Sequence, residues 1–373
     1  MQAERIIGIK SIGLLPTIDI EVDNDNHIFY GNGIATSNSH AVSYAKLGYI
    51  TAYLKKYYTI RFYKSWLNLS IDKQKPFEEI NKLVNDAKLH NINIRVPTIK
   101  KPQIDFYIDN NEIYYGLGAV RGIGESQTSK IREFMANNTI ESWTQFLVDL
   151  SDKLSKTTCE ALIKCGALDT FKLSRKKMEF EYTKWNLLSD LEKDFGRRNR
   201  KTTDNVIDVI RRTAAPKKEG GGCHNAGRAQ KLREVVDSLI NPPYSMVDTA
   251  EDIHNAETYT MGVAITCNKV DGKDTIQANC NCKDILDGVK LREMAVAVTI
   301  SDIQYKKIKN GPNKGKNMAT LSVCDSFGAI KDLCIFEDQL NDFDNLLYKE
   351  NCVILTCYRT QKGALNVKAV EQI

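Results

Sequence analysis

The stretch GLGAVRGIGESQTSKIREF, residues 116–134, combines four closely spaced glycines with a polar segment that follows them. Two glycine motifs that bind phosphate can be excluded here. A P-loop is excluded because no G-K-[S/T] follows the glycines. The spacing of Gly116, Gly118, Gly122 and Gly124 also differs from the G-x-G-x-x-G of dinucleotide-binding folds. The glycines therefore indicate a turn of another kind.

The remaining interpretation is a helix-hairpin-helix element, with its turn at V-R-G-I-G-E and a helix from Glu125 to Phe134. Gly122 and Gly124 allow a tight turn, and the backbone N–H groups at the start of the helix would face a DNA phosphate. We therefore expect Arg121, Gly122 and Gly124 to contact DNA. The alternative is a purely structural turn between packed helices.

Two further segments predict helices. LSKTTCEALIKCGALDTF, residues 154–171, is typical of a helix capped by Gly166. Residues 39–96 repeat apolar side chains at spacings of three and four, which indicates helical structure. We expect most of the aromatic side chains in this repeat to belong to a core; the repeat consists of Tyr44, Leu47, Ile50, Leu54, Tyr57 and Tyr58.

The last ~85 residues change to the alternating pattern of strands. The pattern predicts five strands, with a helix over EDQLNDFDNLL between the third and the fourth: MAVAVTISDIQY, NMATLSVCD, AIKDLCIF, NCVILTCYR and ALNVKAVEQ. Such an arrangement resembles an OB-fold β-barrel. The loop between the first two strands holds five lysines that we expect to contact DNA: Lys306, Lys307, Lys309, Lys314 and Lys316. Phe327, Phe336 and Tyr358 are candidates to stack on single-stranded DNA, or else belong to the core.

The charge of the 373-residue chain is unevenly distributed. The formal total is +5, yet residues 1–38 carry −3, so the rest of the chain is basic. Residues 172–233 hold 17 Lys and Arg against eight Asp and Glu. Such a stretch attracts phosphate backbones without reading sequence, although it can equally be a solvated helical face with a linker at KKEGGG, residues 217–222.

The ten cysteines show no C-x-x-C pair and no His/Cys cluster with zinc spacing; Cys280 and Cys282 are the closest two. We therefore expect free thiols in a reducing compartment and no bound metal in this chain. No apolar run is long enough to span a bilayer, and no secretory signal is visible. The sequence thus predicts a cytoplasmic protein of several domains with no membrane partner.

SHAVSYAKLGYITAYLKKYY, residues 39–58, resembles the fingers region of bacterial DNA polymerase III alpha subunits. The resemblance continues in the order helix, proline-containing link, strand pair and GLGAVRGIGE, and it extends to residues 154–171 and the OB-fold. It implies DNA replication, with primer-template DNA and replisome subunits as partners. In this family the palm carries the acidic metal-binding triad upstream of the fingers, and no D-x-D pair in matching context follows Ser39. Polymerisation with Mg²⁺ is therefore expected only after assembly with a palm-bearing fragment.

The residues before Ser39 resemble the C-terminal splicing blocks of an intein: His27, Phe29, Tyr30, Asn32, Gly33, Ser37 and Asn38. The Asn38 side-chain amide can attack its own carbonyl and cleave the 38–39 bond, because an intramolecular nucleophile acts at high effective concentration. The Ser39 hydroxyl can accept an acyl group, and His27 can transfer the proton. Ser37 occupies the position that is most often His in inteins.

Too few residues precede Asn38 for a whole intein, so we expect a split C-intein whose N-terminal half, with the rest of the polymerase, arrives on another polypeptide. The pattern predicts a hairpin with strands at residues 17–22 and 27–30 and a turn at 23–26. The alternative is an inactive intein remnant on a stand-alone DNA-binding accessory protein built of helix-hairpin-helix and OB modules.

The sequence therefore predicts a multidomain α+β protein that requires no cofactor of its own. The β-rich C-intein would be followed by a mainly helical part and a C-terminal OB-fold barrel. The expected domains are a C-intein (1–38), a fingers segment (39–100), a helix-hairpin-helix region (101–171), a basic helical or linker region (172–245), a connecting segment (246–289) and an OB-fold (290–373).

Overall fold

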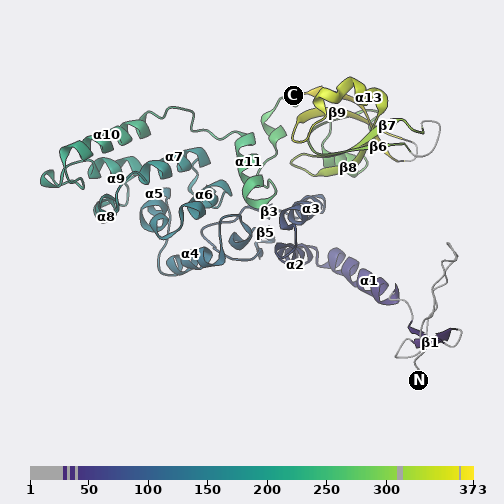
Figure 1. Ribbon diagram of the computed structural model, residues 1–373, viewed down its shortest axis with the longest axis horizontal. Helices are drawn as coiled ribbons and strands as arrows, with labels where there is room; N and C mark the ends of the chain where they lie inside the picture. The colour runs from purple at the N-terminus through teal and green to yellow at the C-terminus, as the bar shows by residue number, and fades with distance from the viewer. Residues whose placement is uncertain (1–27, 32–33, 38–40, 309–313, 361–362) are drawn as a thin grey trace, which may run out of the picture. The chain divides into compact units, whose positions relative to one another are not determined.

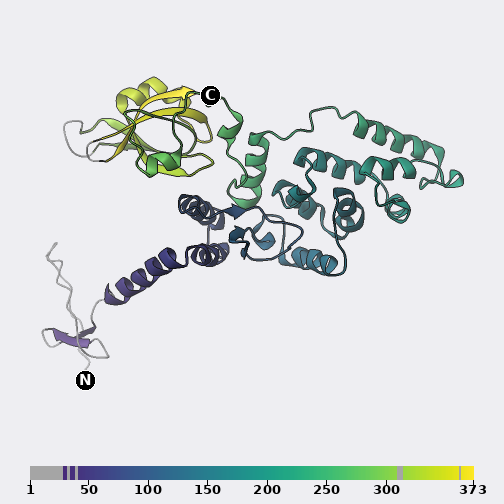
Figure 2. The same ribbon diagram turned by 180° about the vertical axis from the view of Figure 1, so that it is seen from behind.

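The computed structural model describes residues 28–31, 34–37, 41–308, 314–360 and 363–373 (Figure 1). The chain divides into two compact units, Met1–Thr59 and Ile60–Ile373, and each is described here by itself. Figure 2 shows the elements from the opposite side. The fold is α+β: a helical region is followed by a closed five-stranded β-barrel near the C-terminus.

The first unit contains a short antiparallel hairpin, β1 (Ile28–Gly31) paired with β2 (Ile34–Ser37). The register places Ile28 opposite Ser37 and Gly31 opposite Ile34. A strand close to residues 27–30 was predicted, and the structure describes its pairing with β2. The predicted first arm and turn lie outside the described residues, so the structure gives no place for them.

The first unit also contains helix α1 (Ala41–Tyr57), which confirms a helix early in residues 39–96. The prediction that the aromatic side chains of this repeat are core is wrong. Tyr44 is 69% exposed, and Tyr57 and Tyr58 are exposed as well. The aliphatic members of the repeat are also exposed: Leu47, Ile50 and Leu54. Tyr49, Tyr53 and Tyr57 form a row of neighbouring rings along the helix. They remain exposed because α1 is the single helix that the structure describes in this unit.

The second unit begins its core with α2 (Thr59–Ile71) and α3 (Pro76–Leu89). Tyr63 and Leu67 of α2 are fully buried, as is Val84 of α3. A small sheet follows in the order β3-β5-β4, formed by Ile94–Arg95, Glu112–Tyr114 and Tyr107–Asp109. The predicted strand pair is thereby confirmed. Its turn holds Asn110 and Asn111 at φ of 48° and 61°, a left-handed conformation that Asn tolerates better than most residues.

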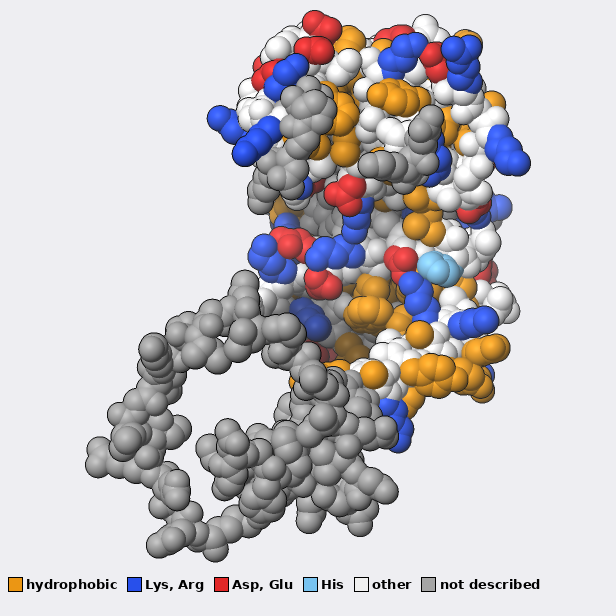
Figure 3. Space-filling view, turned by 90° about the vertical axis from the view of Figure 1, so that its right-hand side faces the viewer, with side chains coloured by type: hydrophobic (Ala, Val, Ile, Leu, Met, Phe, Trp, Pro, Cys, Tyr) orange, Lys and Arg blue, Asp and Glu red, His pale blue; other side chains and the backbone are white. Residues whose placement is uncertain are grey.

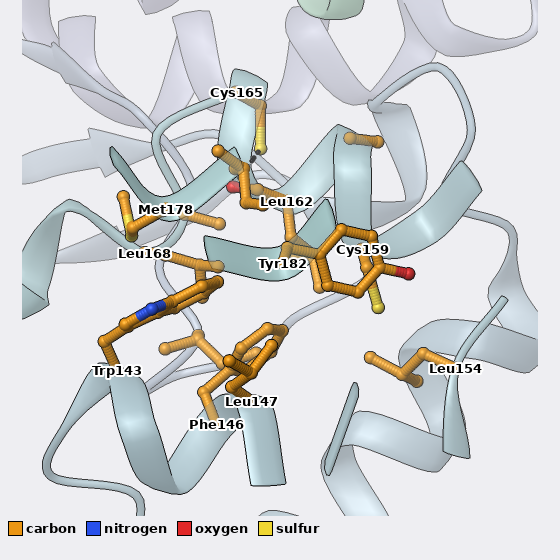
Figure 4. Packing of buried hydrophobic residues seen from close by; sticks show 14 of the residues in the cluster. Trp143, Phe146, Leu147, Leu154, Cys159, Leu162, Cys165, Leu168, Met178 and Tyr182 are labelled. Carbon is orange, nitrogen blue, oxygen red and sulfur yellow. Dashed lines mark hydrogen bonds between the residues drawn. The ribbon is translucent and has the colours of Figure 1, made fainter. Parts of the chain in front are cut away.

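The next helices enclose the main hydrophobic core (Figure 4). In chain order they are η1 (Leu117–Ala119), α4 (Glu125–Asn137), α5 (Trp143–Gln145), η2 (Phe146–Leu150), η3 (Ser151–Lys153), α6 (Lys156–Lys164), η4 (Asp169–Phe171) and α7 (Arg175–Trp185). Trp143, Phe146 and Leu162 converge in this core with Met178 (Figure 4). The predicted cap of α6 is confirmed, because Gly166 has a φ of 81° directly after the helix.

Residues 190–240 form three helices, α8 (Asp190–Asn199), α9 (Val206–Thr213) and α10 (Ala226–Ile240), that we call the basic wing. Side chains of Asn205 and Asn225 cap the last two at their N-termini. The predicted linker at residues 217–222 is instead a folded turn containing η5 (Lys217–Glu219). Here Gly221 N–H donates to Pro216 O at 3.0 Å, and Cys223 N–H donates to Ala215 O at 3.0 Å.

Helix α11 (Ala250–Met261) returns the chain from the wing to the helix-hairpin-helix region (Figure 1). Its ends are sharply defined, because Thr249 and Asp252 form a capping box and Gly262 terminates it with a φ of 78°. The connection to the barrel contains η6 (Lys269–Gly272) and α12 (Cys282–Leu286). Both lie against barrel strands.

The barrel is closed in the order β10-β8-β7-β6-β9. Its strands are β6 (Met294–Lys307), β7 (Asn317–Cys324), β8 (Ala329–Phe336), β9 (Cys352–Arg359) and β10 (Leu365–Gln372). Helix α13 (Glu337–Phe343) and η7 (Asp344–Leu346) connect β8 with β9. The five predicted strands and the helix between the third and the fourth are therefore confirmed, and the architecture is OB-like. Alternate residues of β7 are buried, as expected for a strand with one face in a core.

Candidate nucleic-acid interface

The turn that leads into α4 depends on Gly122. This residue has a φ of 91°, where a side chain is strained, and its Cβ would lie 3.2 Å from Thr157 Cγ2. The Thr158 hydroxyl donates to the Gly122 carbonyl at 3.0 Å and joins the turn to α6. The prediction that Gly122 permits a tight turn before a helix starting at Glu125 is confirmed.

Gly124 lies at the N-cap of α4 in an extended conformation and has no side chain to accept from the first turn. It is exposed, and a Cβ built there meets nothing within 4 Å. The start of α4 is therefore open to a ligand, and the partial positive charge of a helix N-terminus favours an anion. Glu125 already places one carboxylate in this first turn, which weakens that attraction.

Arg121 is held between two aromatic rings. Its guanidinium carbon lies 4.8 Å from the centre of the Phe77 ring and 5.0 Å from that of Tyr259. Its backbone N–H donates to the Thr260 carbonyl at 2.8 Å. Cation–π contacts of this kind stabilise by about 0.5–1 kcal/mol each at exposed sites. Arg121 therefore ties α3, the turn and α11 together, in addition to its predicted role in DNA contact.

A buried ion pair holds α11 in that position. Glu257 is fully buried and accepts from Arg175 Nη2 at 2.8 Å, from the Ile265 N–H at 2.6 Å and from the Thr266 N–H at 2.9 Å. Arg175 also donates to Asp169 at 2.7 Å. Burial alone would lower the pKa of Arg175, but its bond to Asp169 and the nearby Glu257 charge raise it above the ordinary value. Arg175 thus stays charged, and its bond to Glu257 fixes α11 against α7.

The lysines of the β6–β7 hairpin surround its connecting loop. Lys306 pairs in register with Met318 and Lys307 with Asn317, and both side chains are exposed. Lys314 and Lys316 are exposed on the returning side, whereas Lys309 lies outside the described residues. The Ile308 N–H donates to the Lys316 carbonyl at 3.0 Å and closes this end of the hairpin. The structure therefore brings four of the five predicted lysines together.

The barrel also exposes aromatic side chains, of which Tyr305 adjoins these lysines in the sequence. Tyr305, which the sequence analysis did not single out, is 61% exposed directly before Lys306 on β6. Its position at the end of an alternating strand, directly before a run of lysines, could have indicated a DNA contact from the sequence. Among the predicted aromatics, Phe327 is 57% exposed and Tyr358 39%, while Phe336 is half-buried. Tyr305 and Phe327 can therefore offer a ring face to a base.

The arginines of the basic wing are largely neutralised within the protein. Arg212 contacts Asp204 at 2.6 Å, Arg228 contacts Glu192 at 2.7 Å and Arg200 contacts Asp149 at 2.8 Å. Further pairs join Arg197 to Asp152, Arg198 to Asp194 and Arg211 to Asp208. In the view of Figure 3, which does not face the wing, basic and acidic side chains also lie next to one another. The net charge of this stretch therefore overstates what it offers a phosphate.

A basic pocket lies between α2 and α4, and the sequence analysis missed it. Its cavity of about 660 Å³ is lined by Arg61 and Lys64 of α2, Arg132 of α4 and the segment from Gln103 to Ile108. Among the described residues, none of these three cations has an ion-pair partner. The sequence gives no indication that these three residues form a site, because they are single charges up to 71 positions apart.

The predicted splicing residues cannot be placed in the structure. His27, Asn38 and Ser39 lie outside the described residues. Ser37 is the last residue of β2, and the structure describes its backbone pairing with Ile28 but not its side chain. In the sequence, His27 directly precedes Ile28 and Asn38 directly follows Ser37.

The ten cysteines are free thiols, as predicted, and six are buried: Cys159, Cys165, Cys223, Cys282, Cys352 and Cys357. Within the described ranges, no group of three or more His, Cys, Asp or Glu side chains is arranged to hold a metal ion. None of the described helices is long and apolar enough to cross a membrane.

Comparison with known proteins agrees with this geometry. A family described as "Helix-hairpin-helix motif" matches residues 91–178, which include the Gly122 turn, α4 and α6. The chain is 28% identical over 332 residues to DNA polymerase III subunit alpha of Helicobacter pylori strain J99, covering 84% of this chain and 25% of that protein. The same subunit of Thermus aquaticus is 31% identical over 137 residues, or 36% of this chain and 11% of that protein.

The chain is thus homologous to the C-terminal region of DNA polymerase III alpha subunits and spans about a quarter of their length. The match to the subunit of Chlamydia muridarum, at 24% identity, covers 93% of this chain and 26% of that protein. A match of that length cannot begin at Ser39, so it includes part of residues 1–38. The similarity concerns the polymerase region and gives no support for an intein.

Proposed function

We propose that residues 39–373 are the DNA-binding, C-terminal part of a replicative DNA polymerase of the polymerase III alpha type. The observation that carries the proposal is the homology over most of the chain, combined with a helix-hairpin-helix match at the Gly122 turn. The four described lysines of the β6–β7 hairpin and the exposed Tyr305 add a second surface suited to DNA.

Helix α1 supports assembly with a second polypeptide. It exposes large apolar side chains around its surface, including Tyr44, Tyr49 and Leu54. A helix that is apolar all round is normally buried, and an exposed apolar patch of this kind is typical of an interaction site. The match covers about a quarter of the length of these relatives, and the remaining part of such a protein is the partner that we propose covers α1.

We further propose that the chain incorporates no nucleotide until it joins a palm-bearing partner. Two-metal phosphoryl transfer needs clustered carboxylates, and these are expected on that partner together with the Mg²⁺ ions. A primer-extension assay on the purified chain with Mg²⁺ tests this, and template-dependent extension by the chain alone would contradict it. DNA binding without any activity after joining the partner would instead favour an accessory DNA-binding protein.

The finer proposal is that the joining occurs by protein trans-splicing at the 38–39 bond. It rests on the sequence alone, through the spacing of His27, Asn38 and Ser39. Its test needs the chain mixed with a polypeptide that carries an N-intein half. Mass spectrometry should detect a ligated product together with the excised segment ending at Asn38.

Two variants separate the steps of this reaction. Asn38→Ala should abolish cleavage of the 38–39 bond while association with the N-intein partner persists, because the side-chain amide is the nucleophile. Ser39→Ala should block ligation while slow cleavage continues, because Asn38 can still cyclise. Ligated product at normal yield from either variant would show that the residue had been assigned the wrong role.

A further inference from the structure

We propose that the basic pocket between α2 and α4 binds phosphate groups through Arg61, Lys64 and Arg132. As a site for the backbone of DNA, the pocket rests on the function proposed above and adds a contact region distinct from the helix-hairpin-helix turn and the β6–β7 hairpin. The pocket holds no motif that would reveal it in the sequence. The fold forms the pocket by bringing together positive charges that are distant in the sequence.

The three cations converge from two helices. Arg61 and Lys64 are three residues apart on α2, a spacing that places both side chains on one face of the helix. Arg132 reaches the same cavity from α4, and its Nε donates to the Pro102 carbonyl at 3.4 Å. This single backbone contact leaves the guanidinium charge without a carboxylate among the described residues.

The charge of the pocket is not balanced from within. Asp105 is the one carboxylate among the lining residues that the structure describes, so the lining carries a net charge of +2. The arginines of the basic wing are different, because carboxylates lie within salt-bridge distance of most of them. A ligand with two negative charges would therefore complete the pocket electrostatically.

The wall of the pocket is fixed before any ligand arrives. The Phe106 N–H donates to Asn68 Oδ1 at 2.8 Å, and Asn68 Nδ2 donates back to the Phe106 carbonyl at 3.3 Å. The Gly118 N–H donates to the Ile104 carbonyl at 3.0 Å, behind the same segment. Because these bonds hold the wall in place, binding requires little ordering of the backbone.

The size of the pocket limits the ligand to a few phosphate groups. A cavity of about 660 Å³ lies within the range of roughly 300–1,000 Å³ that small-molecule sites occupy. Phosphate esters are the shared chemistry, and they can come from the backbone of a DNA strand or from a free nucleoside triphosphate. Arg and Lys bind both without reading a base.

The test uses the full chain and two probes, a fluorescent 20-residue thymidylate oligonucleotide and dTTP. The variant Arg61→Gln/Lys64→Gln/Arg132→Gln removes the three charges. A control variant, Lys73→Gln/Lys130→Gln/Lys231→Gln, removes three exposed charges elsewhere. The unfolding midpoints of the parent protein, the pocket variant and the control variant are compared to establish that both variants fold.

We expect the pocket variant to bind at least one probe about tenfold more weakly at 0.1 M salt, and the control to change less than twofold. Loss confined to the oligonucleotide identifies a strand as the ligand, and loss confined to dTTP identifies a free nucleotide. If the parent protein binds the oligonucleotide and both variants match it for both probes, the pocket proposal is overturned while DNA binding stands. If the parent protein binds only dTTP through the pocket, the DNA-binding proposal fails and the pocket stands. A parent protein that binds neither probe overturns both.

Discussion

The basic wing and the β6–β7 hairpin are both rich in positive charge, but they use it differently. In the wing, Arg200, Arg212 and Arg228 each contact a carboxylate. Its five lysines are dispersed between Lys193 and Lys231, and only two of them are adjacent in sequence. In the hairpin, five lysines fall within 11 consecutive residues, and the four described ones are exposed. The pairing and spacing of charges, more than net charge, therefore decide what a region offers to DNA.

If ion pairs stabilise the fold, removing one partner should lower the free energy of unfolding. We expect the largest effect at Glu257. We predict that Glu257→Gln lowers the free energy of unfolding by about 3–5 kcal/mol, because it leaves Arg175 buried with an incomplete set of partners. Chemical denaturation followed by circular dichroism measures this change.

The matched control is Glu160→Gln, which removes a partly exposed partner of Lys156 at 3.8 Å. It should cost less than about 0.5 kcal/mol, as is usual for surface pairs on a helix. Equal losses from the two variants would mean that the buried pair does not fix α11.

If the clustered charges act on DNA, removing them should change affinity and leave stability unaltered. We predict that replacing the five hairpin lysines by Gln weakens primer-template binding about tenfold or more at 0.1 M salt. The slope of log K against log salt should become shallower by about 0.9 for each phosphate that the variant no longer neutralises. Fluorescence anisotropy at several salt concentrations gives both quantities.

The control for net charge is a variant with five exposed lysines replaced by Gln, four from the wing and one that precedes it: Lys201, Lys217, Lys218 and Lys231, with Lys172. It removes the same charge from a dispersed set and should reduce affinity by a smaller factor. If the two variants weaken binding equally, the total charge of the chain matters and the clustering does not.

We expect the smallest change in stability for the ion pair between Asp204 and Arg212 in the wing, which depends on pH. The hydrogen bonds from Arg212 and then from the Lys201 N–H lower the pKa of Asp204 to about 2. A carboxyl group whose pKa is lower in the folded state stabilises the fold above its ordinary pKa of about 4, and this stabilisation disappears as the pH falls towards 2. We predict that Asp204→Asn loses about 1 kcal/mol or less at pH 7.

The free energy of unfolding, measured at pH values from 7 to 2, tests whether the stabilisation by Asp204 disappears as the pH falls. The difference between the parent protein and Asp204→Asn should shrink as the pH falls below 4. A difference that stays constant over this range would show that Asp204 acts through shape and not through its charge.

The barrel and the Gly122 turn were predictable because local chemistry determines them. Alternation along β7 marks a strand with one buried face, and Gly122 marks a backbone conformation that few residues adopt. The order of the strands in the closed barrel could be inferred only from the resemblance to an OB-fold.

Other features depend on partners that are distant in the chain. Periodicity placed Tyr44 and Leu47 on a helix, but it cannot show whether a second element covers them. The glycines of residues 217–222 suggested a linker, yet a Cβ on Gly221 would lie 2.0 Å from the Ala215 carbonyl, so this glycine serves a close approach. The pairing of Arg200 with Asp149 spans 51 positions and has no local signal.

Buried thiols lie in both the helical core and the barrel of the second unit, so their reactivity can measure how often each part unfolds. Burial raises the pKa of Cys165 in the helical core to about 12, and that of Cys357 in the barrel also to about 12. Because the thiolate is the reactive form, neither side chain reacts with an alkylating reagent until the surrounding fold opens. The rates at which the two sites are labelled therefore compare, within one molecule, how often the helical core and the barrel unfold.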